Sequence, residues 1–402
     1  IACPHTEAML LHLLCHVVVF SALGGEIARE AYGQDICDTT TLLQVHQKQN
    51  QLMMMDAGLD AAAGCPAVPD IKCRQQHGHK ERGPDRRMKI MFNKMPSKRI
   101  TPVKCSVCQN AHAHGYLYSV ERYDGLGQRA AHLIMCLATA RKYNLNFGGL
   151  LPNPVRSVHG VDMRKYLGAL VGTDYNHILR RVRHAEFDTC VYGSNQLRRK
   201  GSTRGRNVLY HQCNFGRDIV NFLTPGFLND LRRHSALLKG PTPNFDRTKR
   251  HHIAVHIRRG DISARTKQRG RDKPDKVYLQ LITIVTKMLK DADVHVFSTT
   301  KEGNYRSKDF DIYRSRGYKV HLDRNEMDDW KHMAQADVLI QAPSGFSWVA
   351  GVLNRNCVVA YSSYSGRLRN WIVHNDGRFR RSAKKALAQC IKKRLLERPL
   401  KR

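Results

Sequence analysis

The stretch HHIAVHIRRGDI, residues 251–262, places two adjacent arginines, a glycine and an aspartate directly after a short apolar segment. Apolar residues at every second position predict a β-strand that ends at these arginines. The guanidinium groups of Arg258 and Arg259 match phosphate oxygens as planar forks, and Asp261 could hold one arginine while the other binds a ligand. The pattern favours a site for a doubly charged anion. The alternative is a strand end followed by a solvated charge cluster.

Two glycine-containing loops could bind the same kind of ligand. GLGQR, at Gly125–Arg129, connects a predicted strand to a predicted helix, and APSGFSWVAGVLN, at Ala342–Asn354, has the same pattern. Glycine lets backbone N–H groups approach a ligand, and a helix N-terminus attracts anions. The alternatives are a plain tight turn for the first loop and an ordinary N-cap at Ser344 for the second.

Strand and helix patterns alternate around these loops, which predicts an α/β fold with parallel sheets. We expect strands at YLYSVERY, NLNFGG, HHIAVHI, VHVFST, YKVHLD, ADVLIQA and CVVAYS, and helices at 130–143, 278–289, 325–335 and 346–354. Two Rossmann-like halves, joined by a linker near 238–250, describe this order best. Ligands of such folds bind at the carboxyl ends of the strands, where all three loops are expected.

The domain organisation that we predict has five parts. They are a signal anchor at 1–25, a stem or poorly ordered lead-in at 26–110, an N-terminal α/β domain at 111–240, a Rossmann-like domain at 245–376 and a basic C-terminal helix at 377–402. In the last part Ala383, Leu387, Ile391 and Leu395 recur at helical spacing, which predicts a helix that lies on the domain.

The anchor prediction depends on the apolar stretch Ala8–Gly25, which approaches the length of a membrane-spanning helix. A cleaved signal peptide and a buried helix are the alternatives. As a type II anchor it would place the rest of the chain in a lumenal compartment, where disulfides persist.

Composition narrows the classes of partner. A net charge of +33 and a pI of about 10.0 favour phosphates, nucleic acid or anionic membranes, and a 42% hydrophobic fraction excludes a disordered chain. The chain lacks an RNP-type aromatic motif and a zinc finger, so we expect no nucleic acid partner, although a basic nucleic-acid-binding protein is the rival interpretation. Of twelve cysteines, Cys105 and Cys108 form a lone CxxC, for which a disulfide or free thiols are favoured over a zinc site.

HIRRGD closely resembles the HxRRxD motif of the α1,2-, α1,6- and protein O-fucosyltransferases. GLGQR resembles the GLGNR/GLGNQ loop of these enzymes, and APSGFSWVAGVLN is similar to the SSFSWW segment of the α1,2 group. The three motifs occur in the order of the family, in islands across roughly residues 116–375. The resemblance implies a two-domain GT-B type glycosyltransferase that uses GDP-fucose as its donor, inverts the anomeric carbon and needs no metal or other cofactor. It further implies that 111–240 forms the acceptor side, that 245–376 forms the donor-binding domain, and that the anchored catalytic part lies in the Golgi lumen.

By motif match, the resemblance also assigns site residues. Arg258, Arg259 and Asp261 would form the catalytic motif, with Arg258 at the β-phosphate and Asp261 positioning the arginines. The remaining binding residues would be His256 against the donor, Ser344, Gly345, Phe346 and Ser347 near the diphosphate, and Gly125, Gly127 and Arg129 on the acceptor side.

Two positions depart from the family pattern. Gln128 replaces the usual Asn, and the acidic residue that follows the motif in the α1,6 group is missing from ISART. The base that deprotonates the acceptor is therefore unassigned, with Asp261, Asp272 and Asp275 as candidates. An inactive lectin-like relative is the second rival to an active fucosyltransferase.

Overall fold

The computed structural model describes residues 70–73, 103, 105–122, 124–151, 163–179, 184–187, 189–191, 207–210, 213, 219–240, 245–246, 248–260, 262, 271–301, 305–362 and 366–393. All of them belong to the second of two compact units, Ala67–Arg402. The predicted anchor at 1–25 and nearly all of the lead-in at 26–110 lie outside the described residues. Of the helices within the described residues, none has the length and hydropathy needed to cross a membrane.

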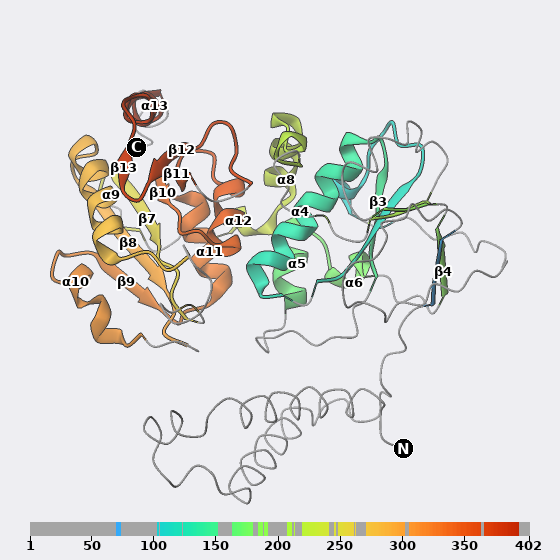
Figure 1. Ribbon diagram of the computed structural model, residues 1–402, viewed down its shortest axis with the longest axis horizontal. Helices are drawn as coiled ribbons and strands as arrows, with labels where there is room; N and C mark the ends of the chain where they lie inside the picture. The colour runs from blue at the N-terminus through green and yellow to red at the C-terminus, as the bar shows by residue number, and fades with distance from the viewer. Residues whose placement is uncertain are drawn as a thin grey trace, which may run out of the picture. The chain divides into compact units, whose positions relative to one another are not determined.

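The N-terminal half contains a four-stranded parallel sheet in the order β3-β2-β6-β5 (Figure 1). Its strands are β2 (Tyr116–Val120), β3 (Asn146–Leu151), β5 (Thr189–Val191) and β6 (Asn207–Tyr210), and a separate parallel pair joins β1 (Asp70–Cys73) to β4 (His184–Phe187). The helices are α4 (Leu126–Lys142), α5 (Met163–Val171), α6 (Tyr175–Ile178) and α8 (Pro225–His234), with short 3-10 turns at Ser106–Cys108, Ile219–Phe222 and Ala236–Leu238.

The C-terminal half contains a seven-stranded sheet in the order β13-β12-β11-β10-β7-β8-β9. Its strands are β7 (His251–His256), β8 (Ala292–Ser298), β9 (Lys319–Leu322), β10 (Val338–Ile340), β11 (Cys357–Tyr361), β12 (Ile372–Asn375) and β13 (Arg378–Phe379). All pair in parallel except β13, which is antiparallel to β12. The six parallel strands have the Rossmann order 3-2-1-4-5-6, which reverses between β7 and β10.

Helices cover both faces of this sheet (Figure 1). They are α9 (Asp275–Met288), α10 (Asp311–Arg314), α11 (Glu326–Gln335), α12 (Gly345–Leu353) and α13 (Arg381–Ile391), with a 3-10 turn at Ser307–Phe310. Ile253 and Val255 pack with α9, α10 and α13, whereas Ala254 between them packs with α11 and α12. The period-2 side-chain alternation of a strand buried on both sides explains this division.

The two halves share one hydrophobic core, in which α12 packs against α4. The approach is closest at Gly127, where an added Cβ would lie 2.3 Å from the backbone nitrogen of Phe346. Gly345 lies opposite, and its added Cβ would lie 3.1 Å from the Gly127 carbonyl carbon. Glycine is therefore needed at 127 because two backbones occupy the space of a side chain.

All the strands predicted in the sequence occur, and the four predicted helices occur as α4, α9, α11 and α12 with ends that differ by a few residues. The N-terminal half begins earlier than position 111, because Val103, Cys105, Val107 and Cys108 are buried in the shared core. Cys105 and Cys108 form a disulfide, one of the two states favoured over a zinc site.

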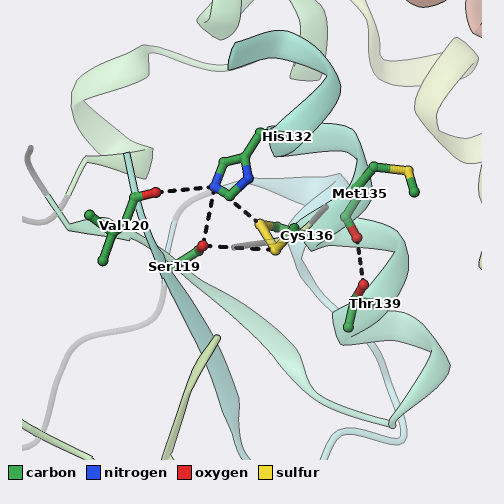
Figure 2. The surroundings of a disulfide bond; sticks show 7 residues. Ser119, Val120, His132, Met135, Cys136 and Thr139 are labelled. Carbon is green, nitrogen blue, oxygen red and sulfur yellow. Dashed lines mark hydrogen bonds between the residues drawn. A yellow bond between two sulfur atoms is a disulfide. The ribbon is translucent and has the colours of Figure 1, made fainter. Parts of the chain in front are cut away.

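Two further disulfides join distant segments. Cys136 on α4 pairs with Cys213, and Figure 2 shows that the His132 ring lies beside this bond. The His132 Nε2–H donates to the carbonyl of Val120 at 3.1 Å, which ties α4 to the end of β2. Cys357 on β11 pairs with Cys390 on α13.

The predicted C-terminal helix is α13, and it lies on the domain as expected. Leu387 and Ile391 are buried against the sheet, and Ala383 packs beside them. Leu395, the next residue of the predicted apolar face, lies outside the described residues.

The contact at Gly127 predicts an asymmetry between two Gly→Ala substitutions. Gly127→Ala forces the backbones of α4 and α12 apart and is expected to cost about 2–4 kcal/mol, because overpacking against a backbone cannot relax by side-chain rotation. Gly226→Ala, in the first turn of α8 with nothing within 4 Å of the added Cβ, is the matched control and should be neutral or slightly stabilising. Thermal unfolding of both variants checks this, and equal melting temperatures would contradict it.

Candidate functional site

A cavity of about 420 Å³ lies where the carboxyl ends of β7 and β10 meet the N-terminal half. This is the point at which the strand order of the C-terminal sheet reverses, where Rossmann-type sheets bind their ligands. The lining residues are Asp124, Gly125, Leu126, Gly127, Gln128 and Met163 from the N-terminal half, and His256, Ile257, Arg258, Arg259, Gly260, Arg271, Ser298, Thr299, Lys301, Asp323, Arg324, Glu326, Asp329, Ser344, Gly345 and Phe346 from the C-terminal half.

The two arginines of HIRRGD have different environments. Arg259 is 3% exposed, and its guanidinium donates to Asp272 at 3.1 Å and to Asp275 at 2.8 Å. The Tyr305 ring lies 4.6 Å from this guanidinium, and Tyr305 also donates to Asp272. Arg259 thus has mainly a structural role, because its ion pair with Asp272 and Asp275 fixes the residues directly after β7. Arg258 is only partly buried and contributes to the cavity wall.

The aspartates that hold Arg259 are therefore Asp272 and Asp275. Asp261, which we expected in this role, lies outside the described residues. Asp272 and Asp275 were candidates for the catalytic base, but both are bound to Arg259 and neither is among the residues that line the cavity.

His256, the last residue of β7, is buried in the cavity wall. Burial, together with the nearby positive charge of Arg258, lowers the pKa of the His256 imidazole to about 3, so this ring is neutral near pH 7. Its Nδ1 has no hydrogen-bond partner among the described residues. A buried polar atom without a partner is costly, so a ligand group is the expected partner.

Both glycine loops form helix N-termini at the cavity. Gly125 is the N-cap of α4, and no side chain caps this helix. Ser344 is the N-cap of α12, where its hydroxyl oxygen accepts a hydrogen bond from the Phe346 backbone N–H. Ser344 is thus an ordinary N-cap, as one sequence alternative stated, and it also lines the cavity beside Gly345. The two helix N-termini direct positive dipole ends toward the same space.

Two predicted site residues do not line the cavity. Arg129 forms an ion pair with Glu121, which also accepts a hydrogen bond from Tyr175, and it is not among the lining residues. Ser347 is fully buried, and its hydroxyl donates to the carbonyl of Ala342 at 3.1 Å. Both side chains therefore support the loops that form the cavity.

Seven charged residues of the cavity were not predicted from the sequence, namely Asp124, Arg271, Lys301, Asp323, Arg324, Glu326 and Asp329. Asp323 follows β9, where its carboxylate accepts hydrogen bonds from Thr299 and from the Thr300 backbone. Arg324 is its neighbour in the chain. Asp329 on α11 is 8% exposed, and burial raises the pKa of its carboxyl to about 7 although the charge of Arg324 acts to lower this pKa. The signal that could have revealed Asp323 and Arg324 is their place directly after a predicted strand.

The residues of the cavity include no His, Cys, Asp or Glu group with metal-ligand spacing within the part of the chain that the structure describes. The one such group there is His132 with Cys136 and Cys213, whose two sulfurs are joined in the disulfide of the N-terminal half.

The chain therefore has an α/β fold with two Rossmann-like domains, the GT-B type of architecture, and a ligand-sized cavity between them. No protein-family model matches the sequence, and no curated protein matches it. Among solved structures, an E. coli heptosyltransferase WaaC with ADP-2-deoxy-2-fluoro heptose is 11% identical, with 69% of this chain and 99% of that chain covered and a TM-score of 0.36. A trehalose-6-phosphate synthase is 10% identical, with 68% and 77% covered and a TM-score of 0.27. Likeness at this level carries no argument about activity.

The different environments of the two arginines predict different effects of substitution. Arg258→Lys should leave the melting temperature nearly unchanged but weaken phosphate binding by about a hundredfold, because an ammonium cannot present two parallel N–H groups. Arg259→Met should instead destabilise the fold by about 3–5 kcal/mol, because Asp272 and Asp275 lose their shared cation. Thermal unfolding and nucleotide titration of both variants test this. A stable Arg259→Met protein would show that the ion pair does not support the loop.

Proposed function

We propose that this chain is a fucosyltransferase that transfers fucose from GDP-fucose to a hydroxyl of a glycan or glycoprotein, with inversion and without a metal ion. The observation that carries the proposal is the cavity at the reversal point of the Rossmann sheet. It brings HIRRGD, GLGQR and APSGFSWVAGVLN together, three segments far apart in the sequence that resemble motifs of one enzyme family.

The diphosphate of the donor requires concentrated positive charge, which the cavity supplies from three sources. They are the Arg258 guanidinium, the uncapped N-terminus of α4 and the N-terminus of α12. Positive groups that are fixed before the reaction stabilise the charge that develops on GDP as the bond to fucose breaks. The account needs no metal ion, because these groups can take the role that a divalent cation has in other transferases.

Guanine selectivity requires groups that read the base, and Asp329 has the right chemistry. An ionised carboxylate can accept hydrogen bonds from both N1–H and the N2 amino group of guanine. Asp329 lines the cavity, and its carboxylate has no hydrogen-bond partner among the described residues. Adenine and uracil cannot offer the same pair of donors, so we infer that Asp329 contributes to the choice of GDP.

The acceptor would enter from the side of Gly125, Gly127 and Gln128, which form the wall contributed by the N-terminal half. Its hydroxyl oxygen attacks the anomeric carbon opposite the departing GDP, and a base must take its proton. Because Asp272 and Asp275 are bound to Arg259, Asp261 is the candidate that remains from the sequence. The proposal also includes a Golgi-lumenal location with an N-terminal membrane anchor, and the three disulfides within the described residues suit an oxidising compartment.

The proposal predicts nucleotide selectivity. GDP at a hundredfold excess over its Kd should stabilise the protein by about 2.7 kcal/mol, which raises the melting temperature by a few degrees. GMP, UDP and ADP should have much smaller effects, because each lacks the second phosphate or the guanine edge. Equal shifts with all three diphosphates would indicate a generic anion site, and equal shifts with polynucleotide and GDP would favour the nucleic-acid-binding alternative.

The same preparation should release GDP from GDP-fucose when a suitable acceptor and EDTA are present. N-glycan, galactoside and chitin-type acceptors cover the main classes of hydroxyl. Selective GDP binding without turnover on any acceptor would support the inactive lectin-like relative. Turnover that EDTA abolishes and Mn²⁺ restores would overturn the metal-independent mechanism.

The raised pKa of Asp329 predicts how GDP binding depends on pH. Only the ionised carboxylate accepts from both guanine donors, so GDP affinity should be constant above pH 7 and fall about tenfold for each pH unit below it. Isothermal titration between pH 5 and pH 8 measures this. Asp329→Asn is the control, because the phosphates of GDP titrate equally in both proteins while the variant lacks the carboxylate. Parallel pH profiles for the two proteins would remove Asp329 from base recognition.

A further inference from the structure

We propose that Arg324 is a specificity-determining residue that donates hydrogen bonds to O6 and N7 of guanine, and that His321 and His295 are positioning residues that hold it. This inference rests on the proposed function, because it concerns the base of the same GDP. It goes beyond that function by assigning a second base-reading group and the hydrogen-bonded chain behind it.

Arg324 lies in the cavity wall near Asp329, the carboxylate that we propose reads guanine. Arg324 follows β9 and lines the cavity together with Asp329. The charge of Arg324 is the first nearby charge that acts on the Asp329 carboxyl, whereas the charge that acts on His256 is that of Arg258. Arg324 and Asp329 are therefore neighbours among the lining residues, as are Arg258 and His256.

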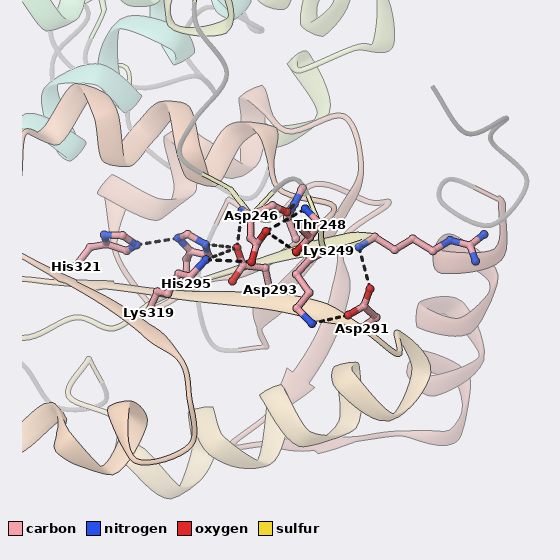
Figure 3. A network of polar contacts seen from close by, with 10 residues as sticks. Asp246, Thr248, Lys249, Asp291, Asp293, His295, Lys319 and His321 are labelled. Atoms are coloured by element: carbon pink, nitrogen blue, oxygen red, sulfur yellow. Dashed lines mark hydrogen bonds and ion pairs between the residues drawn. The ribbon is translucent and has the colours of Figure 1, made fainter. Parts of the chain in front are cut away.

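A chain of three hydrogen bonds runs from Arg324 into the C-terminal domain, and Figure 3 shows its inner part. The Arg324 Nη1 donates to His321 Nδ1 at 2.7 Å. His321 Nε2 and His295 Nδ1 are 2.8 Å apart, and His295 Nε2 lies 2.7 Å from a carboxylate oxygen of Asp293. The chain thus joins a cation at the cavity to a buried anion.

The two ends of this chain determine the tautomers between them. Asp293 can only accept, so His295 carries its proton on Nε2 and accepts through Nδ1. His321 must then donate through Nε2, which leaves its Nδ1 as an acceptor for Arg324. Every donor in the chain meets an acceptor only if both imidazoles are neutral. Burial lowers the pKa of His321 to about 3 and also lowers the pKa of His295, which supports this state.

Aromatic packing fixes the rings that make up the chain. The His321 ring stacks on His295 with centroids 4.9 Å apart and on Phe297 at 4.8 Å. His295 is fully buried, and Lys319 donates to its partner Asp293 at 3.0 Å. The Arg324 side chain is exposed at the cavity, where a free arginine would lose much rotamer freedom on binding. A fixed acceptor at His321 reduces this loss and directs the guanidinium.

The hydrogen-bonding groups of guanine complement the cation of Arg324 and the carboxylate of Asp329. Guanine presents two acceptors, O6 and N7, beside the N1–H and N2 donors, and an arginine fork matches O6 and N7. A cation at Arg324 and a carboxylate at Asp329 would therefore meet two adjacent edges of one base, the Hoogsteen edge with O6 and N7 and the Watson–Crick edge with N1–H and N2. Adenine presents an amino group in place of O6, which the guanidinium would repel, so this arrangement selects guanine.

The experiment compares binding of GDP, inosine diphosphate, ADP and inorganic pyrophosphate by isothermal titration, using Arg324→Gln and His321→Phe. His321→Phe keeps a ring in the stack but removes both nitrogens. We expect each variant to bind GDP and inosine diphosphate about tenfold more weakly, because both ligands carry O6 and N7, and to bind pyrophosphate as the wild type does. The double variant should bind GDP no more weakly than Arg324→Gln, since both changes remove the same interaction.

Lys319→Met is the matched control, because it removes a partner of Asp293 without touching the bonds to His321 or Arg324, and it should bind all four ligands normally. The inference would be overturned if Arg324→Gln bound GDP as tightly as the wild type, or if it lost as much affinity for pyrophosphate as for GDP. In either case, a wild-type protein that prefers GDP to ADP would still support the proposed function. A wild-type protein that binds GDP no better than ADP would overturn both. If His321→Phe does not fold, the exposed Arg324→Gln decides the outcome alone.

Discussion

The ion pair between Arg259 and two aspartates is the interaction on which the site depends. A guanidinium that is 3% exposed would be prohibitively costly without partners, and Asp272 and Asp275 supply them from the start of α9. The ion pair ties Arg259, just after β7, to Asp272 and Asp275, which lie just before and at the start of α9. Because Arg259 is fixed, its neighbour Arg258 is left to form part of the cavity wall.

The contact between the glycine loops GLGQR and APSGFSWVAGVLN fixes the part of the cavity wall formed by the first turns of α4 and α12. Gly127 and Gly345 bring the first turns of α4 and α12 together without side chains between them. Two helix N-termini, one from each half, are thereby directed into one volume. The positive ends of the two helix dipoles thereby add to the charge of the Arg258 guanidinium in the same cavity.

The sequence predicted the elements of the C-terminal half well, because strong period-2 and period-3.6 patterns determine local structure. HHIAVHI and ADVLIQA are strands in the structure, and Asn325 is the N-cap of α11 as its residue type suggests. The strand order could not be predicted in this way, since pairing between β7 and β10 depends on contacts between residues about 85 positions apart. The partners of Arg259 were missed because Asp261 is nearer in the sequence, whereas Asp272 and Asp275 follow Arg259 by 13 and 16 positions.

The cavity residues on and before α11 were missed for a different physical reason. Asp329 follows Glu326 by three positions, and acidic residues in a first helical turn usually face solvent and interact with the helix dipole. Arg324 and His321 resemble a solvated charge and a surface histidine in the sequence. Only the packing of His321 on His295 and Phe297 makes them parts of one connected arrangement.

The disulfide between Cys357 and Cys390 has a consequence for how the protein can be produced. It joins β11 to α13 and so closes a loop that contains the edge of the sheet, where β13 is only two residues long. A short antiparallel edge strand under a tethered helix offers little free backbone to a strand of another molecule. Synthesis in a reducing compartment would leave the Cys357–Cys390 disulfide unformed, expose the β13 edge of the sheet and favour aggregation. An oxidising expression host is therefore the suitable source of material.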